Sequence, residues 1–175
     1  MEPLIHFIIP FVALMLFGVN LRSSLLIALL ALTPDVDALL LVHRSFTHSL
    51  PVVVVFVAPL LLALYRFNPN LLKYGFMGLL SVASHIALDL PTGYTPFLWP
   101  LYNYSMWIQA ELAVHVGSAP TLTLDLRVLT QPIVFEVVRS LDAALFTGWG
   151  LIVSLIILLP LLARALCRRV WSSRR

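Results

Sequence analysis

Residues 33–50, TPDVDALLLVHRSFTHSL, decide how the rest of the chain is interpreted. Within this stretch lie two aspartates, two histidines and one arginine, and apolar segments precede and follow it. Ionisable side chains are unfavourable in a membrane and usually mark function there. We therefore asked whether other polar residues of the chain would meet this stretch in a folded protein.

The composition indicates an integral membrane protein. Of the 175 residues, 61% are hydrophobic and only 11% are charged, whereas a soluble domain is about half apolar and about a quarter charged. The length predicts a single membrane domain over residues 1–175. The single cysteine, Cys167, excludes an internal disulfide bond and a cysteine-based zinc cluster. Glu2 is the only charge before the first apolar run, so we expect no signal peptide.

Apolar segments predict an all-α polytopic protein with about five membrane helices. Residues 3–18 and 23–34 are short for a bilayer core of about 30 Å, so we expect a helical hairpin that does not fully span. A single long bent helix through this region is the alternative. The remaining helices are expected at residues 50–67, 71–90 and 142–162, the last beginning at Asp142. A basic cytoplasmic tail is expected at residues 164–175.

Residues 91–140 differ from the helical segments. Residues 91–107 hold five of the nine Trp and Tyr residues of the chain, which is typical of the headgroup level of a membrane. Residues 111–116 and 121–128 alternate between apolar and polar side chains, and GSAP separates them. This pattern predicts a small β-hairpin. We expect residues 91–140 to form an interfacial loop whose hairpin covers one end of the helix bundle.

Each predicted helical hairpin returns to the membrane face at which it begins, so several polar residues are expected at the same face. The first helix begins there, the second and fourth end there, and the third begins there. In SHIALD, His85 and Asp89 are four residues apart and share one helical face. The residues collected in this layer are His6, Asp35, Asp37, His43, His48, His85 and Asp89.

This combination of side chains indicates a metal site. Neutral imidazoles and carboxylates are ligands for zinc, manganese or iron, and a cation would balance the clustered carboxylates. The candidate ligands outnumber the four that a closed structural site needs, which predicts a catalytic site with one or two ions. Each motif also has a structural alternative: a core histidine for His6, helix caps for DVD, an interfacial loop for HRSFTH and an intrahelical hydrogen bond for SHIALD.

Other polar residues are weaker candidates. His115 would share a strand face with Glu111, and Asp125 could face them across the hairpin; we expect these to be ordinary surface residues. Glu136 is either a ligand, a support for a ligand or a helix cap.

These motifs together resemble a known family. His6, PDVD, HRSFTHS and SHIALDLPT with a later WPL resemble the YdjM-like, LexA-binding, inner-membrane-associated metal-dependent hydrolases over residues 6–101. The chain has Ala38 where many members have His, and Ser45 where they have Gly. TQPIVFE is a degraded counterpart of a family motif that ends in Glu, here Glu136. The resemblance implies a metal-dependent hydrolase, and analogy with zinc-dependent phospholipase C and P1 nuclease suggests a phosphoester substrate.

We therefore expect a membrane-embedded hydrolase that cleaves a lipid phosphoester with a hydroxide formed at the metal. Arg44 would hold the phosphate, and His43 would be a ligand or the general acid. The cofactor would be one or two divalent ions, zinc first and manganese or magnesium as alternatives. The expected metal ligands are His6, Asp35, Asp37, His48, His85 and Asp89.

A metal-binding transporter or a non-enzymatic membrane adaptor is the alternative. A transporter should carry polar groups across the bilayer, whereas residues 52–64 are entirely apolar. A phosphatase of the phosphohistidine type is a third reading, disfavoured because PSGH-like and Lys/Arg-rich motifs are missing. The expected partners are a membrane lipid and the bilayer, with no nucleic acid. The sequence leaves the oligomeric state open.

The basic residues predict the orientation of a multi-pass cell-membrane protein. Three of them belong to the face with the polar layer: Arg44, Arg127 and Arg139. Eight belong to the other face: Arg22, Arg66, Lys73, Arg164, Arg168, Arg169, Arg174 and Arg175. Because cytoplasmic segments carry the excess of Lys and Arg, we expect a cytoplasmic C-terminus and an extracytoplasmic site.

Overall fold

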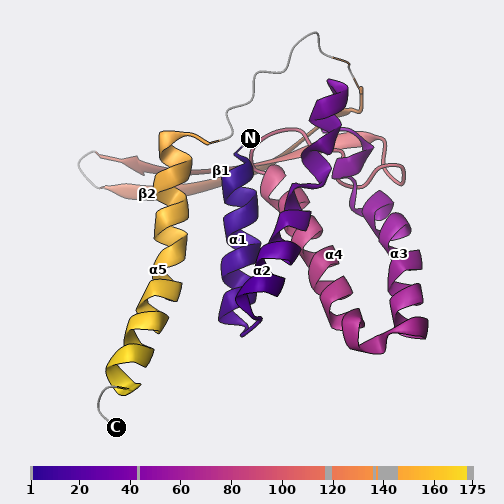
Figure 1. The fold of residues 1–175 in the computed structure, drawn as a ribbon. Coiled ribbons are helices and arrows are strands. Elements are labelled where there is room, and N and C mark those ends of the chain that lie inside the picture. Colours follow the sequence, from indigo (N-terminus) through magenta and orange to yellow (C-terminus); the bar gives the residue numbers. More distant parts are fainter. Residues whose placement is uncertain (1, 43, 117–119, 136, 138–145, 173–175) are drawn as a thin grey trace.

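The computed structural model describes residues 2–42, 44–116, 120–135, 137 and 146–172, the last five by their backbone only. His43, Glu136, Arg139 and Asp142 lie outside the described residues, as do Arg174 and Arg175 of the predicted tail. Helices stand side by side, and a two-stranded ribbon runs across one end of them (Figure 1).

The first two helices form the predicted hairpin, but the helical segment that begins with the second helix continues beyond the predicted end at residue 34. α1 (Pro3–Leu16) ends where Gly18 adopts a φ of +85°. α2 (Leu21–Leu29) begins where the Asn20 side chain accepts a hydrogen bond from the Ser23 N–H at 2.9 Å. The chain continues through the 3-10 helices η1 (Leu30–Leu32) and η2 (Pro34–Leu40), with a bend of 48°. Proline is tolerated at the first position of a helix because no N–H partner is needed there. PDVD can therefore form the first turn of η2.

The second hairpin brings the end of α4 back to the level of η2. The 3-10 helix η3 (Phe46–His48) leads into α3 (Leu50–Phe67), and Ser49 caps α3 by accepting from the Val52 N–H at 3.4 Å. α4 (Pro69–Asp89) begins two residues before the predicted start. Both α2 and η1 contact this helix, and Ala28 in α2, Ala31 in η1 and Ile86 in α4 are 0% exposed. The core formed here holds α4 against the first hairpin.

α5 (Gly148–Ser172) starts later and ends later than predicted. Thr147 determines the start, because its Oγ1 accepts a hydrogen bond from the Gly150 N–H at 3.1 Å. The helix continues to Ser172, so the predicted tail is largely helical. Arg164 ties α5 to α1 by donating from Nη1 to the Leu16 carbonyl oxygen at 2.8 Å, one of the carbonyls left unpaired at the end of a helix.

Three helices of the described chain are long and apolar enough to cross a membrane. They are α3, α4 and residues Gly148–Cys167 of α5, and the bent pair from Leu21 to Leu40 would be a fourth. α1 is apolar but has only 14 residues. The predicted count of about five membrane helices is therefore not confirmed, and the described chain supports three or four spans.

The predicted hairpin is present and longer than expected. β1 (Tyr104–His115) pairs antiparallel with β2 (Thr121–Pro132) along twelve residues of each strand. Its base is joined to the end of α4, where the Ile108 N–H donates to the Leu90 carbonyl oxygen at 2.9 Å. In Figure 1 the ribbon crosses the view at the level of the N-terminal ends of α1 and α5, and its far end extends past α5. Only the base of the ribbon lies beside the end of α4.

Candidate metal centre

Five of the predicted ligands meet at one end of the helix bundle. His6 lies in the first turn of α1, Asp35 in η2 and His48 in η3, while His85 and Asp89 lie in the last turns of α4. The side chains of His48, His85 and Asp89 are 0% exposed, and that of Asp35 is 18% exposed. The predicted convergence of these residues is therefore present in the fold.

Four ligand atoms form a compact group: Asp35 Oδ1, His48 Nε2, His85 Nε2 and Asp89 Oδ2. The two imidazole nitrogens are 3.3 Å apart, and Asp35 Oδ1 lies 3.4 Å from each of them. Asp89 Oδ2 lies 3.3 Å from the His48 nitrogen and 3.6 Å from that of His85. Ligands about 2.0–2.1 Å from a tetrahedral zinc ion are roughly 3.3–3.4 Å apart. The two imidazole nitrogens are thus spaced from each other and from each carboxylate oxygen like ligands around a shared cation.

The buried carboxylate oxygens of this group have no hydrogen-bond partner in the described part of the chain. This holds for Asp35 Oδ1 and for both oxygens of Asp89, although imidazole nitrogens lie close to each of them. A buried carboxylate oxygen without a partner is strongly unfavourable. A divalent cation would satisfy these oxygens and the imidazole nitrogens together, so the residues present fit a bound metal.

His6 extends the site on the other side of Asp89. Its Nε2 lies 3.2 Å from Asp89 Oδ1, and its ring stacks on that of His85 with 4.0 Å between centroids. Candidate ligand atoms of His6, His85 and Asp89 all lie within 4.8 Å of one another, as do those of Asp35, His48 and His85. His85 belongs to both groups. Asp89 faces His6 with Oδ1 and faces His48 and His85 with Oδ2, which is the arrangement of a carboxylate that can bridge two ions.

Asp37 contacts the opposite side of the His48 ring. Its Oδ2 lies 3.3 Å from His48 Nδ1 and accepts hydrogen bonds from the Ser45 N–H at 2.8 Å and from Thr47 Oγ1 at 2.9 Å. Such a carboxylate fixes the tautomer and orientation of a metal-binding imidazole. The structure places Asp37 outside both ligand groups, so its assignment as a ligand stays a prediction from the sequence.

The charges around His48 favour a cation at this position. Burial lowers the pKa of His48, but the carboxylates of Asp35, Asp37 and Asp89 outweigh that effect and raise this pKa to about 10. Without another positive charge the imidazole holds a proton. Because an imidazole must be neutral to bind a metal, metal binding here would release that proton.

Arg44 lies at the edge of the site, beside Asp89. Its Nη2 donates to Thr92 Oγ1 at 2.5 Å, its Nη1 donates to the Tyr94 carbonyl oxygen at 3.3 Å, and its Nε lies 3.8 Å from Asp89 Oδ2. Its φ of +56° is uncommon for a residue other than glycine. A Cβ on Gly93 would collide with Arg44 Nη1. The loop after α4 therefore accommodates the guanidinium closely.

The residues that hold the predicted site residues in place were not predicted from the sequence. Thr47 and Ser45 hold Asp37, and Thr92 and Tyr94 hold Arg44. A threonine directly before a candidate ligand, as in THS, was the available signal. The weaker candidates of the ribbon do not join the described site: His115 pairs with Thr121 at the ribbon end, and Arg127 forms an ion pair with Asp125.

Comparison with known proteins gives the family of the chain. Neither the comparison with curated proteins nor that with solved structures found a match. The YdjM inner membrane protein family matches residues 1–172, which is nearly the whole chain and includes every residue of the candidate metal centre. This match confirms the resemblance seen in the sequence motifs. The chain belongs to the family of YdjM inner membrane proteins.

Proposed function

We propose that this protein is a membrane-embedded, metal-dependent hydrolase that cleaves a phosphoester of a membrane lipid. One observation carries the proposal: the buried Nε2 atoms of His48 and His85 lie 3.3 Å apart and 3.3–3.6 Å from carboxylate oxygens of Asp35 and Asp89, beside the guanidinium of Arg44. A cation site next to a fixed guanidinium is suited to an anionic, oxygen-rich substrate.

The donor set favours zinc, with manganese or magnesium as alternatives, because it combines imidazole nitrogens with carboxylate oxygens. Asp35, His48, His85 and Asp89 would hold one ion, and His6 with Asp89 Oδ1 would contribute to a second. When bound, such a cation acidifies water and neutralises charge that develops on oxygen. Asp37 keeps the His48 ring turned so that Nε2 faces the other ligands.

Arg44 is suited to orienting the substrate phosphate. Its hydrogen bonds to Thr92 and Tyr94 fix the guanidinium, whose planar fork matches phosphate oxygens. The side chains of Asp35 and Arg44 are 18% and 13% exposed, whereas those of His48, His85 and Asp89 are fully buried. We propose that the substrate phosphate reaches the site between Asp35 and Arg44.

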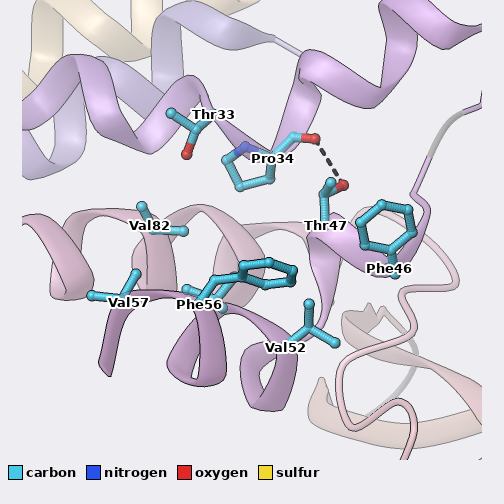
Figure 2. Close-up of a pocket in the computed structure, with 9 residues that line it drawn as sticks. Thr33, Pro34, Phe46, Thr47, Val52, Phe56, Val57 and Val82 are labelled. Atoms are coloured by element: carbon cyan, nitrogen blue, oxygen red, sulfur yellow. Dashed lines mark hydrogen bonds between the residues drawn. The ribbon is translucent and has the colours of Figure 1, made fainter. Parts of the chain in front are cut away.

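An apolar cavity beside the site supports a lipid substrate. The cavity has a volume of about 200 Å³ and lies between α3, α4 and the start of η2 (Figure 2). Val52, Val57 and Val82 line it, together with Phe56, which is 74% exposed and lies on the membrane helix α3. Thr47 lines it as well, and the Oγ1 of Thr47 is 3.1 Å from His48 Nδ1. Part of an acyl chain in this cavity would keep the headgroup beside the ligands.

The orientation proposed for the site is extracytoplasmic. Among the basic side chains that the structure describes, Arg44 and Arg127 belong to the site face. Arg22, Arg66, Lys73 and Arg164 lie on helices nearer the opposite end. Cytoplasmic segments carry the excess of basic residues. Cys167 near the end of α5 should then react with impermeant maleimide only from the cytoplasmic side, and labelling from outside would contradict this orientation.

The function can be tested with the purified full chain in mixed lipid–detergent micelles. Metal content would be measured by elemental analysis, and release of phosphate or headgroup from phosphatidic acid and phosphatidylcholine would be followed after zinc loading and after chelation. We expect hydrolysis by the zinc-loaded wild type and by Asp125→Asn, and none by Asp35→Asn. Bound metal without hydrolysis of either lipid would favour a transporter or adaptor, and a chain that binds no metal would overturn the proposal.

A further inference from the structure

The β-ribbon divides its side chains by type between its two faces. Directly paired residues of an antiparallel ribbon lie on the same face, and successive residues alternate between faces. One face therefore carries an unbroken apolar set: Ile108, Ala110, Leu112, Val114, Leu122, Leu124, Leu126 and Val128. The other face carries the polar and charged residues over the same length, with Ala113 as the exception: Gln109, Glu111, His115, Thr121, Thr123, Asp125 and Arg127.

The apolar face is not covered by the described part of the chain. Leu112 and Leu124, which pair directly, are both 63% exposed, and their neighbours Leu122 and Leu126 are 66% and 65% exposed. An isolated two-stranded hairpin is at best marginally stable in water. A continuous exposed apolar face of this size marks contact with a membrane or with another protein. The ribbon therefore needs a partner for this face.

We propose that the ribbon is an interfacial membrane anchor, whose apolar face lies against the acyl-chain boundary of the leaflet on the site side. It runs across the helices instead of along them, at the level of the first turns of α1 and α5 (Figure 1). It is therefore roughly parallel to the membrane plane and lies near one surface. The first turn of α5 also carries Trp149, 78% exposed, and tryptophan is enriched at this depth.

The chemistry of the ribbon fits the interface and not the interior of the bilayer. Apart from Met106 and Ile108, which pair with Thr95 and Leu90 near the base, the outer edges of this two-stranded ribbon have no strand partner in the described chain. Unpaired backbone groups are not tolerated in the hydrocarbon core. At the interface, water and headgroups can satisfy these edges and the Asp125–Arg127 ion pair, while the apolar side chains reach the acyl region. The described apolar face carries no charge that would oppose this position.

The proposal can be tested with probes on neighbouring residues of opposite faces. In full-length protein carrying Cys167→Ser, Leu124→Cys and Thr123→Cys would each be labelled with an environment-sensitive fluorophore. Both proteins would be reconstituted into phosphatidylcholine vesicles. Quenching by a lipid with a nitroxide high on its acyl chain would be compared with quenching by aqueous iodide. We expect the lipid nitroxide to quench the Leu124→Cys probe several-fold more than the Thr123→Cys probe, and iodide to show the reverse preference.

Two results would overturn the proposal. Equal quenching of both probes by iodide would show that the apolar face is in water. Protection of the Leu124→Cys probe from both quenchers, together with self-quenching that dilution with unlabelled protein relieves, would show that a second copy covers this face. Neither readout depends on metal binding or hydrolysis, so the result is independent of the proposed function.

Discussion

His48, His85 and Asp89 at the end of the helix bundle are fully buried, whereas Leu112, Leu124 and Leu126 on the ribbon are more than 60% exposed. Each region reverses the usual relation between polarity and burial. In both cases the described chain leaves something unsatisfied: carboxylate oxygens in the cluster and apolar side chains on the ribbon. A point charge at a fixed position would satisfy the cluster, whereas an apolar surface of no fixed shape would satisfy the ribbon.

This difference predicts different responses to mutation. Removing one ligand from a metal site of four removes most of the binding, because the remaining ligands cannot replace its charge and geometry. Removing one side chain from an apolar face removes only its share of the buried area. Changes in the cluster should therefore act almost as a switch, and changes in the ribbon should act in small increments.

Asp89→Asn should have the largest effect. Asp89 faces His6 with one oxygen and His48 and His85 with the other. The amide keeps the shape but loses the charge at both positions. We expect the zinc affinity to fall by more than about 100-fold, beyond the effect of losing a group that only supports a ligand. Competition with a chromophoric chelator would measure this. Asp125→Asn on the ribbon is the control, and an unchanged affinity in Asp89→Asn would refute the ligand assignment.

Asp37→Asn should have an intermediate effect. The carboxylate contacts Nδ1 of His48, and Ser45 and Thr47 hold it. Loss of such a support typically reduces metal affinity by about 10–100-fold. We expect the same metal stoichiometry as the wild type at saturating zinc, measured by elemental analysis. If Asp37→Asn instead lost its metal as fully as Asp89→Asn, Asp37 would be a direct ligand, as the sequence alone had suggested.

The contrast between Asp35, which belongs to a ligand group, and Asp37, which does not, shows how much of the site the sequence alone can predict. Helix crossings and the i, i+4 spacing of His85 and Asp89 predicted which residues converge. Which carboxylate faces a ligand nitrogen depends on how PDVD turns, and its continuation of α2 as a 3-10 helix with a 48° bend was not visible in the composition. Side-chain direction is decided by the local backbone, which single motifs do not determine.

The limits of helix prediction have a similar cause. The start of α3 was predicted correctly because Ser49 and Pro51 are local signals. The start of α5 was placed at Asp142, whereas the helix begins after Thr147, another residue suited to capping. The number of spans could not be fixed from apolar runs, because α1 and the bent segment are too short or too irregular to count on their own.

Gly93→Ala should alter the proposed reaction without removing the metal. A Cβ at this position collides with Arg44 Nη1, so the guanidinium must shift. If Arg44 orients the phosphate, a small misplacement should lower kcat/KM for the lipid phosphoester about tenfold, since misplacement by about 1 Å can reduce rates 100-fold. Gly148→Ala is the control for adding a methyl group, because no atom of the described residues lies within 4 Å of its Cβ position. Reduced activity with reduced metal content would instead indicate damage to the ligand cluster.

Leu124→Ser should have the smallest effect, a partial loss of ribbon stability. A partial loss is what distinguishes the ribbon from the ligand cluster. Loss of a leucine partly buried in lipid should weaken the ribbon by about 1 kcal/mol, which raises the fraction of open ribbon about fivefold. Trypsin can report this opening after Arg127, whose side chain is 66% exposed, because cleavage follows the population of the open form when opening is fast. We expect about fivefold faster cleavage in vesicles for Leu124→Ser and no change for Thr123→Ser.

Adding Leu112→Ser should increase the rate of cleavage further, since the contributions of side chains on an apolar face accumulate. A full loss of protection from Leu124→Ser alone would mean that the ribbon depends on one specific contact, and the proposed difference between the two regions would not hold.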